Sequence, residues 1–151
     1  MPYDDLVRAA TAAVVFAVLY AGHMVGDHWT QTQHQSTCKA LGVGGRSVWV
    51  AHWNCAKHVV TYTATQVVLL ALAGWWLNLP LRPWWVVAGL AVSAVTHYVA
   101  DLRVPLRWIC ERVGRIGFYR LAGNGLNGAY LLDQSWHIGW LAVAALLIAG
   151  P

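Results

Sequence analysis

The sequence contains few charged residues. Lysine, arginine, aspartate and glutamate together make up 11% of its 151 residues, whereas soluble domains carry about 25%. This shortage excludes an ordinary soluble domain. Cysteine is also scarce, and the three cysteines present, Cys38, Cys55 and Cys110, have no Cys-x-x-Cys spacing. The cysteines therefore indicate neither a disulfide framework nor a zinc ribbon.

Hydrophobic residues, in contrast, make up 58% of the chain and gather in long runs. A run of about 18 apolar residues or more suggests a membrane span. Four segments qualify, at about 6–28, 47–79, 84–101 and 128–149. Ser47 is the expected N-cap of the second segment, and Pro80 and Pro83 mark a short turn before the third. The sequence thus predicts an all-α fold, a four-transmembrane-helix bundle that forms a single integral membrane domain over residues 1–151.

Two connections between these segments are longer than the third. Residues 29–46 are polar and contain glycines, which indicates a loop or a lid. Residues 105–121 place apolar side chains at helical spacing opposite several arginines, which predicts an amphipathic helix lying in the membrane interface. These apolar residues are Leu106, Ile109, Val113 and Ile116.

The basic residues predict how the bundle is oriented. Four helices place both termini on one side of the membrane and the two long connections on the other. Eight basic residues lie toward the long connections, against only Arg8 and Arg82 on the opposite side. By the positive-inside rule, the long loops face the cytoplasm and both termini face outside. The net charge of +4 then indicates contact with anionic lipid headgroups rather than with nucleic acid. The expected aromatic belt at the outer interface consists of Trp75, Trp76, Trp84 and Trp85.

Aspartates and histidines are paired along the chain. Three of the six acidic residues lie four positions from a histidine, whereas roughly 0.6 such pairs are expected by chance from this composition. A separation of four places both side chains on one face of a helix. Each pair belongs to the cytoplasmic end of its predicted helix, so the bundle is expected to gather them at one mouth. The pairs are His23/Asp27, His97/Asp101 and Asp133/His137.

The second predicted helix adds one histidine to this mouth. His52 and His58 are six positions apart and cannot share a helix face. His58 lies deeper and continues a polar stripe with Tyr62, so we expect His58 to point inward and His52 to face the loop or the headgroups. His28 and His34 belong to the polar connection and are expected to be solvated.

Such a cluster suits a metal site. Ionisable groups at membrane depth cost about 2.5–3.5 kcal/mol each and normally mark function. Imidazoles and carboxylates are suitable ligands for one or two ions of Zn²⁺, the favoured metal, or of Mn²⁺ or Fe²⁺. Asp27 or Asp101 is the expected general base, and Gln31, Tyr62 and Gln134 are expected to hydrogen-bond the ligands. A metal-free proton or ion pathway and a purely structural polar network stay open as alternatives. The expected ligands are His23, Asp27, His58, His97, Asp101, Asp133 and His137.

The stretches HMVGDHWTQ, KHVVTYT, THYVADLR and LLDQSWH together resemble a family of small bacterial polytopic membrane proteins described as a domain of unknown function. That family carries H-x-x-G-D-x-x-x-Q, H-x-x-x-D and D-Q-x-x-H motifs in this order. The resemblance implies a multi-pass protein of the bacterial plasma membrane, with the same histidines, aspartates and glutamines as the family's polar residues. A looser likeness to membrane-bound metal-dependent hydrolases, which also place His and Asp on transmembrane helices, favours hydrolysis.

The leading hypothesis is therefore a metal-dependent membrane hydrolase whose site opens to the cytoplasm. An amphiphilic substrate fits the depth of the site, although no residue selects one. Lys57 and Arg103 lie beside the mouth and could bind a phosphate, but most basic residues at this position face headgroups. The alternatives are a metal-ion or proton transporter and a structural interaction protein, and the oligomeric state stays open.

Overall fold

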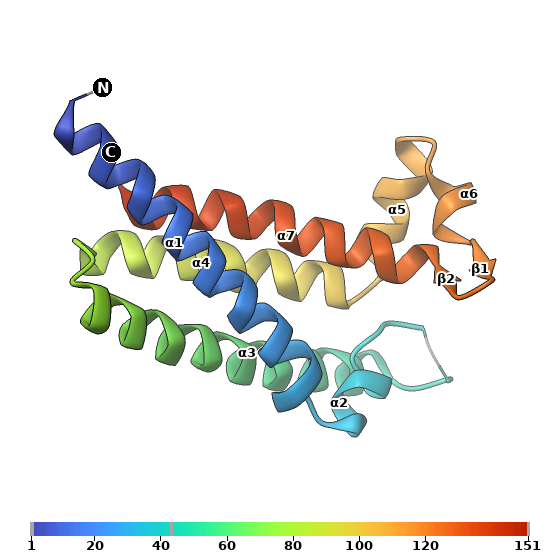
Figure 1. Ribbon diagram of the computed structural model, residues 1–151. Coiled ribbons are helices and arrows are strands. Elements are labelled where there is room, and N and C mark those ends of the chain that lie inside the picture. The colour runs from blue at the N-terminus through green and yellow to red at the C-terminus, as the bar shows by residue number, and fades with distance from the viewer. Residues whose placement is uncertain (1, 43, 151) are drawn as a thin grey trace.

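The computed structural model describes residues 2–42 and 44–150 (Figure 1). Four of its helical segments are long and apolar enough to cross a membrane. The first is α1 (Tyr3–Val25) with the π-helical turn η1 (Gly26–Thr30), and the others are α3 (Val48–Leu77), α4 (Pro83–Asp101) and α7 (Gly128–Ala149). The predicted all-α fold with four candidate spans is confirmed.

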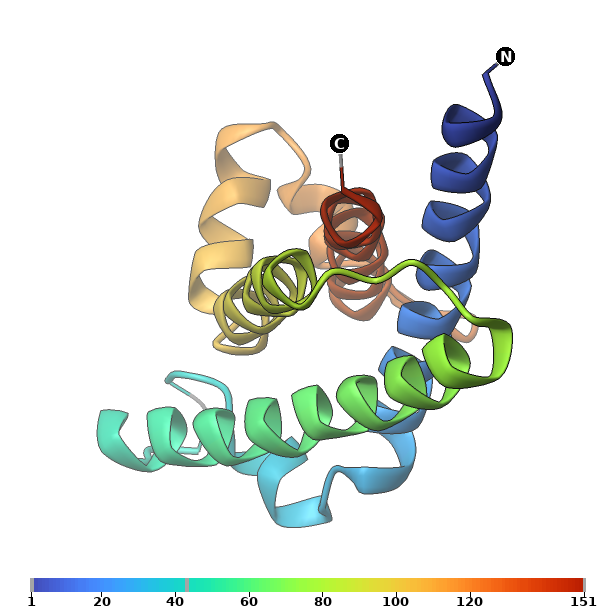
Figure 2. The same ribbon diagram turned by 90° about the vertical axis from the view of Figure 1, so that its left-hand side faces the viewer.

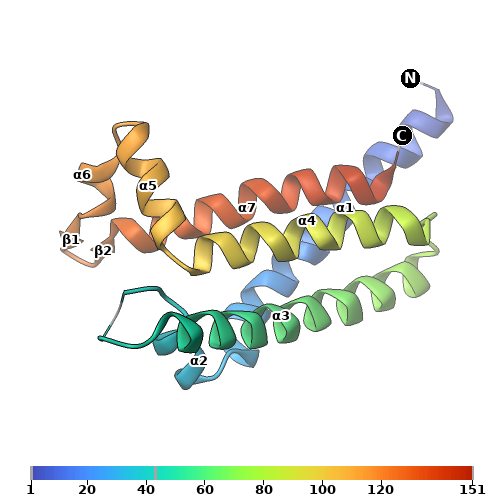
Figure 3. The ribbon, with the colours of Figure 1, turned by 180° about the vertical axis from the view of Figure 1, so that it is seen from behind.

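The four long helices surround a common interior. Helix α1 packs against α3 and α7, and α4 packs against the same two helices, most extensively against α7. Helix α1 crosses the others obliquely, and the view along the bundle shows it leaning away from α3 toward its N-terminus (Figures 1 and 2). Both termini and the α3–α4 turn lie at one end, which we call the terminal end. The opposite end, called the loop end, carries residues 26–42, 44–47 and 102–128 (Figure 3).

Local signals in the sequence explain where the long helices begin and end. The Ser47 side chain accepts a hydrogen bond from the Val50 amide, which confirms the predicted N-cap of α3. Asn78 ends α3 in the left-handed conformation, which asparagine tolerates better than most residues. Pro83 occupies the first turn of α4, where its missing N–H costs nothing. Asn127 caps α7 by accepting from the Tyr130 amide.

The apolar core fills the half of the bundle nearest the terminal end. Helices α4 and α7 approach closely there at Gly89, which has no side chain. A Cβ at this position would lie only 2.7 Å from the Ala144 carbonyl oxygen. Many apolar side chains instead face outward, such as Val60 and Leu146, which are 68% and 66% exposed. An outward apolar surface on helices of this length fits a multi-pass membrane protein. The core consists of Val15, Leu19, Leu70, Leu90, Leu141, Ala144, Ala145 and Ile148.

Both long connections contain more structure than a loop or a single helix. Within 29–46, the short helix α2 (Gln33–Cys38) begins at a capping box between Thr32 and Gln35. The amphipathic segment expected over 105–121 is divided into α5 (Val104–Arg112) and α6 (Ile116–Tyr119). The division falls at Gly114, whose φ of 70° ends the first helix. A two-residue hairpin, β1 (Ala122–Gly123) and β2 (Leu126–Asn127), then leads into α7.

Candidate metal centre

The predicted histidines and aspartates meet in the interior of the bundle toward the loop end. Every long helical segment contributes at least one of them. Asp101 and all four histidines are at least 97% buried, and Asp27 has only 9% of its side chain exposed. Asp133 is the most accessible, with 22% of its side chain exposed. The residues are His23 of α1, Asp27 of η1, His58 of α3, His97 and Asp101 of α4, and Asp133 and His137 of α7.

Four ligand-type atoms form the centre of this cluster. The Nε2 atoms of His58 and His97 lie 3.0 Å apart. Asp27 Oδ1 lies 3.2 Å from the His58 nitrogen and 3.3 Å from the His97 nitrogen. Asp101 Oδ2 lies 3.3 Å and 3.2 Å from the same two atoms. Each nitrogen therefore faces the other nitrogen and one oxygen from each of the two carboxylates. We call these four atoms the central group.

Hydrogen bonding does not account for the central group. A neutral imidazole carries one ring hydrogen, so each Nε2 offers at most one donor to three neighbours. Asp27 Oδ1 and Asp101 Oδ2 are buried and accept no hydrogen bond from any described residue. Buried polar atoms of this kind normally have a partner, and each exception needs an explanation. A cation held between the four atoms would satisfy all of them together.

The spacing of the central group suits a tetrahedral metal site. Zinc binds histidine nitrogen and carboxylate oxygen at about 2.0–2.2 Å, which places neighbouring ligand atoms of a tetrahedron about 3.3–3.6 Å apart. The observed nitrogen–nitrogen and nitrogen–oxygen separations of 3.0–3.3 Å lie at or slightly below the lower end of this range. Small outward shifts of the side chains would therefore complete the geometry. Two imidazoles and two carboxylates also suit manganese and iron.

Aromatic packing holds the His97 ring in place. The ring lies between Tyr62, at a centroid distance of 3.8 Å, and His137, at 4.1 Å. The Nδ1 atoms of His58 and His97 have no hydrogen-bond partner among the described residues. Ring stacking, rather than the usual Nδ1 hydrogen bond, therefore sets the orientation of His97.

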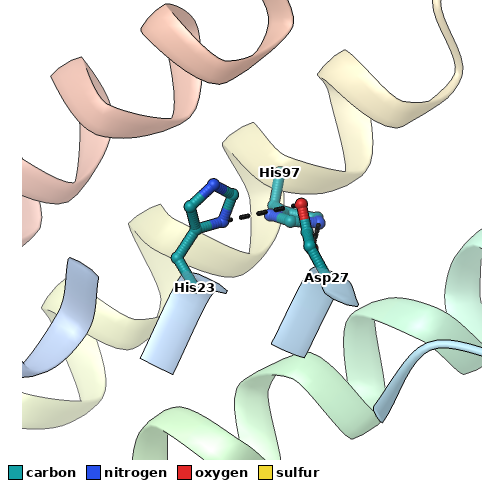
Figure 4. Close-up of side chains that lie close together, drawn as sticks. All are labelled: His23, Asp27 and His97. Carbon is teal, nitrogen blue, oxygen red and sulfur yellow. Dashed lines mark ion pairs between the residues drawn. The ribbon is translucent and has the colours of Figure 1, made fainter. Parts of the chain in front are cut away.

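The remaining predicted ligands flank the central group. His23 Nδ1 lies 3.7 Å from Asp27 Oδ2, the carboxylate oxygen that is not part of the central group, and Figure 4 shows the two side chains with His97. His137 Nε2 lies 3.5 Å from Asp133 Oδ1. Two sets of ligand atoms each gather within 4.8 Å on these flanks, one from His23, Asp27 and His97, the other from Asp101, Asp133 and His137. Either set could hold an ion beside the central one.

The predicted hydrogen-bonding residues behave differently from one another. Gln134 Oε1 lies 3.1 Å from His23 Nε2, as expected of a residue that orients a ligand. The Tyr62 hydroxyl instead pairs with Ser93 and Gln66, so Tyr62 reaches the centre through its ring face. The side-chain nitrogen of Gln31 has no partner among the described residues.

Glycine lets η1 approach α3 beside the centre. A Cβ at Gly26 would lie 2.8 Å from Cδ2 of Tyr62, closer than atoms of neighbouring side chains pack. Gly26 is followed by Asp27, so the same close contact brings the Asp27 carboxylate to His58. The π-helical turn here was not predicted from the sequence.

Lys39 is a buried contact of the cluster that the sequence reasoning missed. It follows α2, is buried, and places its Nζ 2.6 Å from Asp101 Oδ1. The segment is fixed by two further contacts, in which the Leu41 amide donates to the Leu102 carbonyl and Arg46 donates to the Thr37 carbonyl. Residues 32–42 and 44–46 thus cover the loop end of the centre, and Lys39 adds a positive charge to it. No sequence pattern around a lysine in a polar loop predicts such a contact.

Three histidines lie outside the cluster. His52 Nδ1 lies 2.6 Å from the Tyr98 hydroxyl. His28 contacts the Met24 carbonyl and the Tyr130 hydroxyl at the exposed edge, and the exposed His34 lies near Cys38. The three cysteines are buried and free.

Comparison of the chain with known protein families, with curated proteins and with solved structures gives no match. The geometry of the cluster therefore carries the functional argument.

Proposed function

We propose that the protein is a metal-dependent hydrolase of the membrane, with its metal held by His58, His97, Asp27 and Asp101. The observation that carries this proposal is the central group, in which the two buried nitrogens lie 3.0 Å apart and each of the two carboxylate oxygens lies 3.2–3.3 Å from both nitrogens. Zinc is the favoured ion, and manganese and iron are the alternatives. A second ion on the Asp133–His137 flank would give the two-metal arrangement found in other bundle cores.

A divalent metal ion, when bound, supplies Lewis acidity and lowers the pKa of a bound water toward 7. The protein's own residues then determine which carboxylate takes a proton. Asp101 has both oxygens engaged, one in the central group and the other with Lys39. Among the described residues, the only ion-pair partner of Asp27 Oδ2 is His23, at 3.7 Å. We therefore favour Asp27 over Asp101 as the general base, with proton acceptance at Oδ2 and His23 beside it.

The position of the cluster favours an amphiphilic substrate. Of the seven residues, Asp133 is the most exposed and marks the edge at which a substrate meets the site. The loop end also carries most of the basic residues, so we propose that it faces the cytoplasm of a bacterial cell and contacts anionic headgroups. Under this orientation both termini lie outside.

Transport of metal ions or protons fits the structure less well. A conducting path needs polar groups or water on both sides of its binding site. Beyond the cluster, the polar chain formed by Tyr62, Gln66 and Ser93 meets the apolar core. The buried side chains of that core are hydrophobic, and Thr11 is the one buried polar side chain of the described residues between the core and the terminal end. The interior therefore favours a site that opens at one end.

The proposal is tested by chelation and metal restoration. The purified full chain, in detergent, is assayed against a panel of phosphate and carboxylate esters before and after treatment with a chelator. We expect chelation to abolish hydrolysis of at least one ester and zinc, manganese or iron to restore it. Asp27→Asn should be inactive, whereas Asp4→Asn, at the terminal end, should match wild type. Chelator-resistant hydrolysis, or metal flux into liposomes without hydrolysis, would contradict the proposal.

A further inference from the structure

A cavity of about 170 Å³ adjoins the cluster at the loop end. It lies between the start of α5 and the first turns of α7, and Asp133 belongs both to its lining and to the cluster. The cavity is therefore one carboxylate away from the proposed metal ligands. The other lining residues are Arg103, Leu106, Tyr119, Asn127, Ala129 and Tyr130.

The lining combines one positive charge, on Arg103, with the carboxylate of Asp133 and several neutral polar groups. The Arg103 guanidinium forms no ion pair with any carboxylate of the described residues, and Asp133 is paired with His137 instead. Tyr119 and Tyr130 add hydroxyl groups. Arg103 also adopts a φ of 61°, which is uncommon for a residue with a side chain. This conformation turns the chain sharply between α4 and α5 and brings Arg103 to the cavity.

The size of the cavity limits what it can hold. Pockets that enclose whole drug-sized ligands measure about 300–1,000 Å³, so this cavity accommodates a polar group rather than an entire substrate. Arginine binds phosphate and carboxylate through paired N–H groups. A tetrahedral phosphate presents oxygens in several directions and can contact Arg103 on one side and the metal cluster on the other. A planar carboxylate presents both of its oxygens on one side.

We propose that this cavity binds the phosphate group of the substrate, which makes the substrate a phosphate ester. The inference rests on the proposed hydrolase function and specifies its substrate class. In the reaction, the water oxygen forms a bond to phosphorus, the ester P–O bond breaks, and the alcohol oxygen takes up a proton. The products are an alcohol and phosphate. The alcohol is either a lipid or a water-soluble molecule, since the cavity opens near the interface.

The test measures binding of three probes to the metal-loaded full chain: inorganic phosphate, glycerol phosphate, and nanodiscs of phosphatidylcholine with or without phosphatidic acid. We expect at least one phosphate probe to bind and Arg103→Gln to weaken it about tenfold or more. Arg107→Gln is the matched control, because this arginine, one turn further along in α5, pairs with Glu111 and does not line the cavity. Arg103→Lys should retain part of the affinity.

The three probes distinguish a soluble phosphate ester from a lipid, and the two arginine variants show whether the cavity binds phosphate at all. Binding of inorganic and glycerol phosphate supports a soluble ester, and binding of phosphatidic acid alone supports a lipid. If metal-loaded protein binds no phosphate probe, or if Arg103→Gln and Arg107→Gln bind equally, the inference is wrong while the metal site stands. Metal content is measured on the same samples. If the protein holds no metal, the proposed metal-dependent function itself is wrong.

Discussion

Lys39 Nζ lies 2.6 Å from Asp101 Oδ1, while the other oxygen of the same carboxylate faces His58 and His97. The ion pair assigns one oxygen of Asp101 to the lysine and leaves the other for the centre. It also links residues 32–42 and 44–46, which cover the loop end, to the metal ligands. The covering segment and the metal centre are therefore expected to stabilise each other.

Substitution Lys39→Met tests this link. Removing one partner of a buried ion pair costs about 3–5 kcal/mol, because the other charge stays buried without a partner. We expect a loss of this size in the metal-free protein and a smaller loss with zinc, since the metal also offsets the Asp101 charge. Thermal unfolding in detergent, with and without a chelator, measures the loss of stability in the metal-free and in the zinc-loaded protein. Lys57→Met is the control, because Lys57 lies over the Trp53 ring instead, and an equal effect of the two substitutions would refute the link.

Gly26→Ala tests the close approach of η1 and α3. The added methyl would lie 2.8 Å from Tyr62 Cδ2, so the ring that stacks on His97 must move. Overpacking of this kind costs about 1–3 kcal/mol, and we expect a lower melting temperature together with weaker metal affinity. Gly139→Ala adds the same methyl to α7 where no atom lies within 4 Å. That control should be neutral or slightly stabilising, and a Gly26→Ala protein with unchanged affinity would contradict the account.

Sided labelling tests the proposed orientation. The three native cysteines are buried, and burial raises the pKa of the Cys110 thiol, so little reactive thiolate forms at neutral pH. Single substitutions Asp4→Cys and Arg112→Cys then introduce exposed thiols at the terminal and loop ends. In intact bacterial cells we expect an impermeant maleimide to label the first variant only. Labelling of the second alone would reverse the orientation, and labelling of native Cys110 at pH 7 would contradict its burial.

The sequence predicted the helices and most of the cluster because both follow from local periodicity. His97 and Asp101 are four residues apart on one helix, so their shared face could be inferred before the structure was known. Lys39 could not be predicted in this way, because its contact with Asp101 depends on how residues 32–42 and 44–46 fold over the bundle. The π-helical turn at Asp27 and the left-handed Arg103 are likewise set by tertiary packing, which overrides local preference.

The sequence also could not predict which histidines and aspartates of different helices would contact each other. The four-residue rule suggested three separate His–Asp pairs, yet Asp27 of η1 lies closer to His58 of α3 and to His97 of α4, at 3.2 and 3.3 Å, than to His23, at 3.7 Å. Asp133, by contrast, stays with its own His137. These differences arise from the oblique crossing of α1, which brings Asp27 to the middle of the cluster.

Metal content of the purified full chain tests the central claim most directly. We expect one to two equivalents of a transition metal, measured by mass spectrometry after dialysis against metal-free buffer. His58→Ala should lose most of this metal, whereas His52→Ala, a histidine of the same helix bonded to Tyr98, should keep it. Less than about 0.3 equivalents in wild type, or equal metal in the two variants, would contradict a metal centre at His58, His97, Asp27 and Asp101.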